Sequence, residues 1–406
     1  MSIHEPGPGA GQSLRIMLLC SAFNGLTQRV WLDLREQGHH VTVQLALGEA
    51  IIREAADAFT PDLILCPFLK ERVPQDVYGR YKTIIIHPGR TGDRGPSSLD
   101  WTILQGDEEW GVTALEASEV MDGGDIWHTA LYERDTTMRK GVLYNNASAD
   151  AALACVQAVV AHFPAYRAGT WRPTPLDEQD PSVLGRERPS MPRQARAVDL
   201  TADSAEQALL KILASDGVPG APVRFTNVPG TYRAYDAHLE NAGPRLAPGE
   251  VGAWRDEAVL VGTASGNLWI GHLKASGSVK LPATQVLGEH LSREQEWPLA
   301  PQDEPDGLTY QPVTYRRSGR VGTLAWTLYN GAMSTAQLRR LQAAVAHAAA
   351  DDTDVLVVLG GPDAFSNGIH LNVIEASATP AREAWENINA INDVIFDLLN
   401  MPEKLI

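Results

Sequence analysis

The sequence predicts an α/β protein with three modules, and three patterns along its 406 residues lead to that prediction. Over residues 14–170, short apolar runs alternate with segments of helical spacing, which is typical of a parallel sheet covered by helices on both faces. Over residues 199–290, short β-like runs are separated by Gly and Pro, which favours a small β-barrel. From residue 311 onward, strand and helix patterns alternate again. The Pro-rich segments 171–198 and 291–310 are expected to be linkers.

Each element of the first module is predicted from its own pattern. Strands are expected at Arg15–Cys20, Val41–Leu47, Leu63–Cys66 and Thr83–His87, and helices at Leu26–Arg35 and Ile51–Phe59. In an open α/β sheet, ligands bind beyond the carboxyl ends of the parallel strands. His87 lies at such an end, so we expect a functional site there.

The remaining elements follow in order along the chain. In the second module, helix Ala205–Ala214 is expected to precede β-like pieces at Ala258–Val261, Leu268–His272 and Gly277–Leu281. In the third module, strands are expected at Val321–Leu328 and Val355–Leu359, and helices at Thr335–Ala350 and Pro380–Leu399. The last residues, MPEKLI, are expected to begin another strand. Because a strand needs neighbours, the third module is predicted to be incomplete.

Composition limits the classes of function. The chain has 34 Lys and Arg against 50 Asp and Glu, and the net charge of −16 argues against nonspecific binding to nucleic acid or to an anionic membrane. Cys20, Cys66 and Cys155 form no CxxC pair, which favours buried free thiols over a redox or metal site. No apolar run approaches the roughly 18 residues of a membrane span, and the N-terminal residues lack an apolar signal region. We therefore expect a cytoplasmic protein without a metal.

His87 and Asp122 are candidates for proton transfer. A loop rich in Gly and Pro follows His87, and Asp122 comes 35 residues later in an Asp-Gly-Gly turn. An ionised Asp122 near His87 would favour the imidazolium and orient a water that relays a proton. By themselves, a histidine at a strand end and an Asp-Gly-Gly turn also fit purely structural roles.

The segment around these two residues resembles the HPSLLP…G…G-T…D-G-G pattern of glycinamide ribonucleotide and methionyl-tRNA formyltransferases. His87-Pro88 matches the His-Pro of that family, Gly111-Val112-Thr113 matches its strand before the catalytic turn, and Asp122 matches its aspartate. The resemblance implies a Rossmann-like domain followed by an OB-like barrel, with His87 and Asp122 as catalytic residues. It also implies formyl-tetrahydrofolate as the donor, bound through Phe68, Leu69, Lys70, Gly111 and Thr113.

One position departs from the formyltransferase pattern. The family has Asn-x-His, and this chain has Ile85 where the asparagine is expected. Since that asparagine helps to stabilise the oxyanion, another donor is needed or the chemistry differs. The candidates are Ser97, Ser98 and backbone N–H groups.

The loop Cys20–Arg29 lies where the same fold binds the phosphate of the acceptor. Asn24, Gln28 and Arg29 are the residues expected to bind coenzyme A there, because Asn24-Gly25 before a helix offers free N–H groups. A plain strand–helix turn with an exposed Arg29 explains the sequence equally well.

The third module resembles the enoyl-CoA hydratase/isomerase (crotonase) family over the loop from Leu359 to Leu371. The resemblance implies that the backbone N–H of Ile369, directly after Gly368, polarises a thioester carbonyl. It also implies coenzyme A contacts from Asn330, Ala332, Asn367 and Gly368. His370 fits either a catalytic role or a cap of the following helix, and we favour the cap.

The combination of these modules resembles the HypX/HoxX family of [NiFe]-hydrogenase maturation factors. The likeness is strongest over His87–Trp101 and Ser366–Ala376. It implies that formyl moves from formyl-tetrahydrofolate to coenzyme A and that formyl-CoA is then decarbonylated to CO. Transient contact with hydrogenase maturation proteins is the partner it implies. Two alternatives stay open: a formyltransferase acting on an amine of a sugar nucleotide or peptide, and a non-catalytic scaffold that binds folate or coenzyme A.

Overall fold

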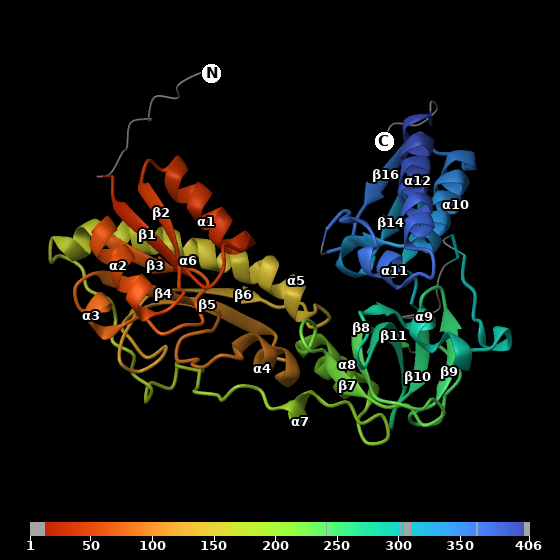
Figure 1. The fold of residues 1–406 in the computed structure, drawn as a ribbon, viewed down its shortest axis with the longest axis horizontal. Helices are drawn as coiled ribbons and strands as arrows, with labels where there is room; N and C mark the ends of the chain where they lie inside the picture. Colours follow the sequence, from red (N-terminus) through yellow and green to blue (C-terminus); the bar gives the residue numbers. More distant parts are fainter. Residues whose placement is uncertain (1–12, 241, 301, 304–309, 363, 402–406) are drawn as a thin grey trace. The chain divides into compact units, whose positions relative to one another are not determined.

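The computed structural model describes residues 13–240, 242–300, 302–303, 310–362 and 364–401. The chain divides into two compact units, Met1–Pro192 and Arg193–Ile406, which are described separately (Figure 1). The strand expected over residues 401–406 falls outside the described part except for Met401, which is buried and not in a strand.

The first unit is built on a six-stranded mixed sheet with strand order β2-β1-β3-β4-β5-β6. Its strands are β1 Arg15–Cys20, β2 His40–Leu45, β3 Leu63–Cys66, β4 Lys82–His87, β5 Glu109–Glu116 and β6 Ile126–Glu133. The first four are parallel, as predicted. The sheet as a whole is mixed, because β5 and β6, which are not among the four predicted parallel strands, run antiparallel. The tight turn around Asp122 joins them directly, which only an antiparallel pair allows.

Two apolar faces of this sheet are covered by helices. The helices are α1 Gly25–Glu36, α2 Glu49–Phe59, α3 Gln75–Tyr78, α4 Ser98–Gln105, α5 Lys140–Asn145 and α6 Ala147–Arg167. Ile16 and Leu18 point toward α1 and α6, whereas Met17 and Leu19 point toward α2 and α3, as the two-residue period of a strand requires. Among the described helices, residues 140–167 are long and apolar enough to cross a membrane by length and composition, but half of that apolar window is buried within the first unit.

Residues 171–192, within the predicted linker, lie along the first unit. Thr174 exchanges backbone hydrogen bonds with Ile126, and Arg188 donates its N–H to the carbonyl of Arg94. Met191 is buried. We call residues 182–192 the strap, because they run beside the loop that follows His87.

The second unit begins with a six-stranded antiparallel sheet, the region predicted to be a barrel. Its elements are α7 Arg193–Arg196, α8 Ala205–Ala214, β7 Ala221–Val223, β8 Tyr232–Glu240, β9 Val251–Arg255, β10 Ala258–Gly262, β11 Asn267–Ala275, β12 Leu281–Pro282 and α9 Ala283–Leu287. The strand predicted at Gly277–Leu281 was wrong except for Leu281. Gly277 has φ +76° and forms a turn, so the backbone cannot continue the ladder there.

The rest of the second unit holds a small sheet with order β13-β14-β16 and two long helices packed on it. The elements are β13 Val313–Ser318, β14 Val321–Trp326, β15 Ala332–Met333, α10 Thr335–Ala350, β16 Val355–Leu359, β17 Gly368–Ile369, α11 Leu371–Ala376 and α12 Pro380–Leu399. Short 3-10 turns lie at Gly288–His290, Arg293–Gln295 and Tyr329–Gly331. The helices begin and end as predicted because their caps are strong: Ser334 caps α10, and Pro380 stands in the first turn of α12.

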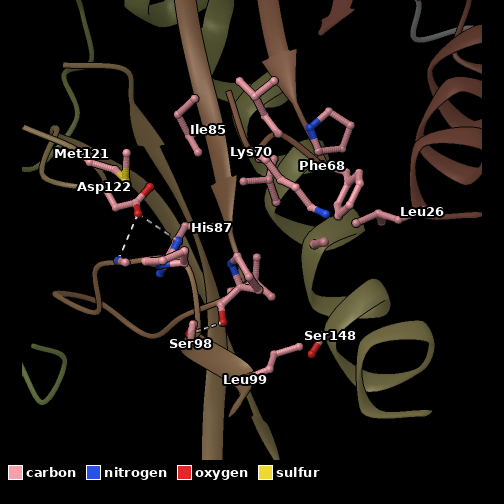
Figure 2. A pocket seen from close by; sticks show the side chains of 18 of the residues that line it. Leu26, Phe68, Lys70, Ile85, His87, Ser98, Leu99, Met121, Asp122 and Ser148 are labelled. Atoms are coloured by element: carbon pink, nitrogen blue, oxygen red, sulfur yellow. Dashed lines mark hydrogen bonds and ion pairs between the residues drawn. The ribbon is translucent and has the colours of Figure 1, made fainter. Parts of the chain in front are cut away.

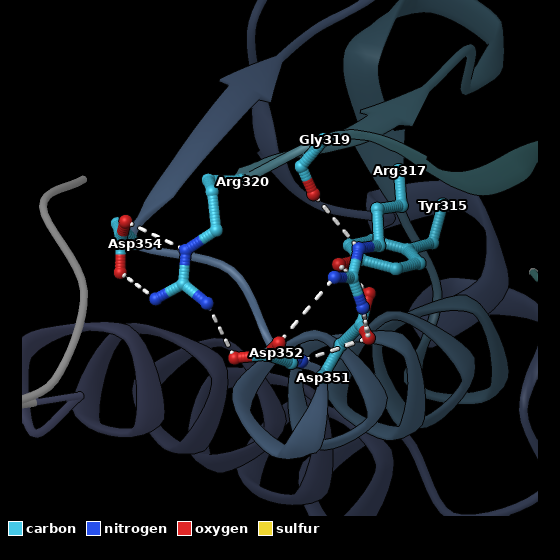
Figure 3. A network of polar contacts seen from close by, with 7 residues as sticks. All are labelled: Tyr315, Arg317, Gly319, Arg320, Asp351, Asp352 and Asp354. Carbon is cyan, nitrogen blue, oxygen red and sulfur yellow. Dashed lines mark hydrogen bonds and ion pairs between the residues drawn. The ribbon is translucent and has the colours of Figure 1, made fainter.

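An exposed polar network closes one end of the β13-β14-β16 sheet (Figure 3). Arg317 contacts Asp351 at 2.8 Å, and Arg320 reaches Asp354 through its Nε at 2.8 Å. The hydroxyl of Tyr315 donates to Asp351 at 2.8 Å. Because the two arginines are well exposed, each ion pair contributes little to stability, and the network serves mainly to fix the turn at Gly319.

Two capping boxes in the second unit give a matched pair of variants. Ser334 is buried, accepts from the N–H of Gln337 and donates to the buried Glu257 at 2.5 Å, whereas Ser204 caps α8 at a more exposed position. Ser334→Ala should therefore destabilise the unit by about 2–3 kcal/mol, since it also leaves a buried carboxyl oxygen unpaired. Ser204→Ala should cost about 1 kcal/mol. Denaturant unfolding with hydrogen exchange at the start of each helix measures both, and equal losses would contradict the role given to Glu257.

Candidate active site

The structure brings His87 and Asp122 together at one edge of the first sheet (Figure 2). His87 is the last residue of β4 and is only 5% exposed. Its Nδ1 lies 3.5 Å from Oδ2 of Asp122. Asp122 has φ +53°, a left-handed conformation that turns its carboxylate back toward the sheet. Gly124 is required in this turn, because a Cβ there would lie 1.9 Å from the carbonyl oxygen of Glu116.

A second carboxylate on His87 was missed by the sequence reasoning. Oδ2 of Asp93 lies 2.9 Å from Nε2 of His87, and Asp93 is 2% exposed. Burial by itself lowers the pKa of His87, but the hydrogen bond to Asp93 and the negative charges of Asp122 and Asp93 raise it above the usual value. The imidazolium is therefore favoured. A carboxylate six residues after His87 in a Gly-rich loop was the available signal.

A cavity of about 600 Å³ opens beside His87 in the first unit. Its walls come from the end of β4, the loop after β3, the loop before α4, the turn at Asp122 and helices α5 and α6. Figure 2 shows Phe68, Lys70, Ile85, His87 and Asp122 among the side chains around it. Other lining residues include Leu26, Leu69, Arg72, Ser98, Leu99, Met121, Lys140, Tyr144 and Ser148. The volume falls within the range of cavities that enclose a cofactor-sized ligand, about 300–1,000 Å³.

Two of the predicted folate residues do not line this cavity. Among the described residues its walls include Phe68, Leu69 and Lys70 but neither Gly111 nor Thr113. Thr113 is buried in β5, and its hydroxyl donates to the carbonyl of Gly89 at 2.8 Å. A Cβ at Gly111 would lie 2.9 Å from the carbonyl oxygen of Ala130. Both residues thus shape the sheet and the loop after His87.

Ile85 lies on the same face of β4 as His87 and lines the cavity. Unlike the asparagine of the formyltransferase pattern, isoleucine offers no hydrogen-bond donor. The hydroxyl of Ser98 donates to the carbonyl of Pro88 at 2.6 Å, and that of Ser97 accepts from the N–H of Met191 at 3.0 Å. The N–H of Gly95 points to Asp122 at 3.3 Å. Ser98 and the N–H of Gly95 therefore already donate to other groups, and Ser97 is absent from the described cavity wall. The positive charge favoured on His87 lies on the same strand face as Ile85.

The predicted acceptor loop is a capped helix start. Asn24 accepts from the N–H of Thr27 at 3.0 Å and donates to the hydroxyl of Tyr144 at 3.0 Å. Gln28 donates to the carbonyl of Phe23, and Arg29 pairs with the exposed Asp150 at 2.6 Å. Within the described chain, none of Asn24, Gln28 and Arg29 belongs to the cavity wall, although Tyr144 does. The local geometry matches the strand–helix turn that was the alternative to a binding loop.

In the second unit, the two segments predicted to bind coenzyme A lie side by side. Strand β15 pairs with β17, which joins Ala332 to Gly368 and Met333 to Ile369. The side chain of Asn367 donates to the carbonyl of Asn330 at 2.6 Å, and Asn330 has φ +57°. The sequence reasoning missed Asn387 on α12, which accepts from the N–H of His370 and donates to the carbonyl of Met333.

His370 is a helix cap, as favoured from the sequence. Its Nδ1 accepts from the N–H of Val373 at 3.3 Å at the start of α11, and its ring stacks on His272. Burial and the neighbouring His272 lower the pKa of His370 to about 4. A neutral ring suits a cap, because a cap must accept a hydrogen bond.

The three cysteines are buried and free, as predicted. Burial raises the pKa of Cys155 to about 11, so its thiol is inert at neutral pH. Over the part of the chain that the structure describes, no group of three His, Cys, Asp or Glu side chains is arranged to hold a metal ion.

Comparisons with known proteins agree with this architecture. Residues 191–290 match the model of the formyl transferase C-terminal domain. The hydrogenase maturation factor HoxX of Bradyrhizobium diazoefficiens is 38% identical over 97% of this chain and 67% of its own length. The crystal structure of HypX from Aquifex aeolicus in complex with tetrahydrofolic acid is 39% identical, with a TM-score of 0.89 over 97% of this chain and 68% of that chain. The methionyl-tRNA formyltransferase of Bacillus subtilis is 25% identical over 58% of this chain and 72% of its own length. The chain thus spans about two-thirds of the length of HoxX and HypX.

The lowered pKa of His370 predicts acid sensitivity around α11. An unfolded histidine has a pKa of about 6.5. The neutral ring of His370 therefore stabilises the fold fully above that pH, and this stabilisation is lost as the pH falls toward about 4. The total loss in the free energy of unfolding is roughly 3 kcal/mol. His370→Asn keeps a capping side chain that does not titrate. At about pH 7.5, hydrogen exchange at α11 should be equally fast in the variant and in the unaltered chain. At about pH 5, it should be slower in the variant. His347→Asn, at an exposed position, is the control and should respond to acid like the unaltered chain. If His370→Asn also responds like the unaltered chain, His370 is not the source of the acid sensitivity.

Proposed function

Because the chain belongs to the HypX/HoxX family of hydrogenase maturation factors, we propose that its first unit transfers a formyl group from formyl-tetrahydrofolate to the thiol of coenzyme A. Formyl-CoA would then be decarbonylated by the crotonase-like module in the second unit. The CO released would supply the carbonyl ligand of a [NiFe] hydrogenase in the cytoplasm, through transient contact with other maturation proteins.

One observation carries this proposal: a buried imidazole between two carboxylates forms part of the wall of the large cavity of a formyltransferase-type sheet. The cavity fits a folate by volume and by chemistry. Phe68 and Leu69 offer apolar surface, while Lys70 and Arg72 offer the positive charge that suits a ligand ending in carboxylates. The tetrahydrofolic acid bound to the Aquifex HypX, a protein with the same fold, supports this assignment.

The transfer balances without another reactant. The sulfur of the thiol forms a bond to the formyl carbon, the bond from that carbon to N10 of the folate breaks, and the thiol proton ends on N10. Negative charge develops on the formyl oxygen in between. In this chain the imidazolium of His87 would stabilise that charge, because Ile85 offers no amide donor. Asp122, on the cavity side of the ring, would orient a water that relays the proton from the thiol to N10.

The thioester half of the proposal rests on the paired loops of the second unit. Ile369 lies in β17, and its N–H is the proposed donor to the formyl-CoA carbonyl. Asn330, Ala332, Asn367 and Gly368 gather around it and are the proposed contacts of coenzyme A. Decarbonylation breaks the C–H and C–S bonds of the formyl group and returns the hydrogen to the thiol, so its products are CO and free coenzyme A.

Variants of the first site test the transfer. Full-length protein supplied with formyl-tetrahydrofolate and coenzyme A should form formyl-CoA and release CO, detected by mass spectrometry and a reduced haem probe. His87→Ala and Asp122→Ala should each lower formyl-CoA formation by roughly 10²–10⁴-fold, because they remove the cation or the proton-transfer group. His162→Ala, which removes a ring stacked on Trp171 away from the cavity, is the control and should keep full activity. Normal turnover by both site variants would remove His87 and Asp122 from the mechanism.

Titration calorimetry with coenzyme A separates the alternatives. A formyltransferase acting on an amine predicts no binding of coenzyme A and transfer to a sugar nucleotide or peptidyl amine. A non-catalytic scaffold predicts binding of folate or coenzyme A with no turnover of formyl-tetrahydrofolate. The absence of Asn at position 85 is the observation that favours the scaffold.

A further inference from the structure

His87 is held on both ring nitrogens, and the second contact has no counterpart in the sequence pattern that predicted the site. We propose that Asp93, backed by Arg188 of the strap, is the positioning residue that fixes the orientation and the charge of the His87 ring. Its importance for turnover rests on the transfer reaction proposed above, whereas its effect on the ring does not depend on any substrate.

The two carboxylates have different places around the ring. Asp122 lines the cavity and lies 3.5 Å from Nδ1 of His87. Asp93 is absent from the described cavity wall, is 2% exposed and lies 2.9 Å from Nε2. Nε2 must therefore carry a hydrogen that it donates to Asp93. Nδ1 is left as the nitrogen that can exchange a proton on the side of Asp122 and the cavity.

Backbone contacts with the strap hold Asp93 in place. The N–H of Gly185 donates to the carbonyl of Thr91 at 3.1 Å, and the N–H of Arg188 donates to the carbonyl of Arg94 at 3.0 Å. A Cβ at Gly185 would lie 2.0 Å from the backbone nitrogen of Asp93, so only glycine permits this approach. The loop after His87 is thus fixed by a segment 94 residues further along the chain.

Charge balance explains why the ring should be cationic. Nη2 of Arg188 lies 3.9 Å from Oδ1 of Asp93, and Arg188 is 7% exposed. That oxygen has no hydrogen-bond partner among the described residues, so Asp93 depends on Arg188 and His87 for compensating charge. With a protonated ring, the set of Asp93, Asp122, Arg188 and His87 is neutral. With a neutral ring, it would carry one uncompensated negative charge in a largely buried place, which is costly.

Further charges near this set do not change the conclusion. The guanidinium groups of Arg90 and Arg188 both lie over the ring of Trp110, at 4.9 and 5.5 Å. Asp107 and Arg186 also act on Arg188, with opposite signs. The electrostatic contributions to His87 itself come from Asp93 and Asp122, and both raise its pKa.

Nuclear magnetic resonance of the histidine rings in the full chain tests this without substrate. The unaltered chain should show His87, assigned by loss of its signal in His87→Asn, titrating above about 6.5. Asp93→Asn should lower that midpoint by about one unit or more, since it removes the charge and keeps the shape. Asp93→Glu, which keeps the charge, should leave most of the increase in the titration midpoint of His87 in place. Glu187→Gln alters an exposed neighbour of Arg188 on the strap and should leave the titration unchanged.

Kinetics add a second readout. Asp93→Asn should lower kcat for formyl-CoA formation by about 10- to 100-fold and leave KM for formyl-tetrahydrofolate within about twofold, because the residue does not face the cavity. The pH profile of kcat should shift in the same direction as the titration midpoint of His87. Asp93→Glu should recover part of kcat, which a merely structural role would not predict.

The outcomes separate this proposal from the function on which it rests. Unchanged titration of His87 in Asp93→Asn overturns it, as does a midpoint at or below about 6.5 in the unaltered chain, a measurement that stands even if the variant does not fold. If the midpoint falls in Asp93→Asn while no form of the protein makes formyl-CoA, the positioning role holds and the transfer reaction fails.

Discussion

The first unit depends on one constraint: a histidine and two carboxylates are held together with little access to water. Such groups are stable only when their charges compensate and their hydrogen bonds are made. His87 meets the condition by bonding Asp93 on one nitrogen and facing Asp122 with the other. The surrounding backbone can be understood as the means of bringing these three side chains to one point.

Three separate devices produce that geometry. Strand β4 ends at His87, and the two-residue period of the strand puts Ile85 on the same face. The left-handed conformation of Asp122 and the close approach at Gly124 bend the β5–β6 turn back toward the ring. The strap then fixes the loop that carries Asp93. The three devices come from different parts of the chain and position the same ring. A change in any one of them should therefore alter the contacts of the imidazole.

Much of the fold could be predicted from the sequence, because its signals are local. Helices α8, α10 and α12 have caps or a proline at their first turn, and their bounds agree with the predictions. The direction of β5 and β6 could not be predicted in the same way. Strand β6 at the sheet edge is largely half-buried, so its sequence lacks the continuous apolar run that marks a central strand.

The site was predictable in part for the same reason. His87 and Asp122 follow recognisable strand and turn patterns, and the structure brings them together. Asp93 follows no such pattern. Its position beside His87 depends on the contacts between the strap and the loop, which are distant in the sequence. Gly111 and Thr113 belong to a strand that resembles the family pattern, but resemblance does not say which side of a strand faces the ligand. Thr113 instead supports the loop from behind through Gly89.

Two buried histidines show how the neighbours of a ring, rather than burial alone, set its chemistry. His370 is buried beside another imidazole and has no carboxylate partner among the described residues. Its pKa therefore falls, and the neutral ring accepts a hydrogen bond as a helix cap. His87 is buried at least as deeply, yet two carboxylates raise its pKa. A cation in a cavity wall can oppose negative charge that develops on a substrate, whereas a neutral acceptor at a helix end cannot. Isoleucine at position 85 is then physically consistent with the proposed transfer, because the charge that an asparagine would stabilise would meet an imidazolium instead.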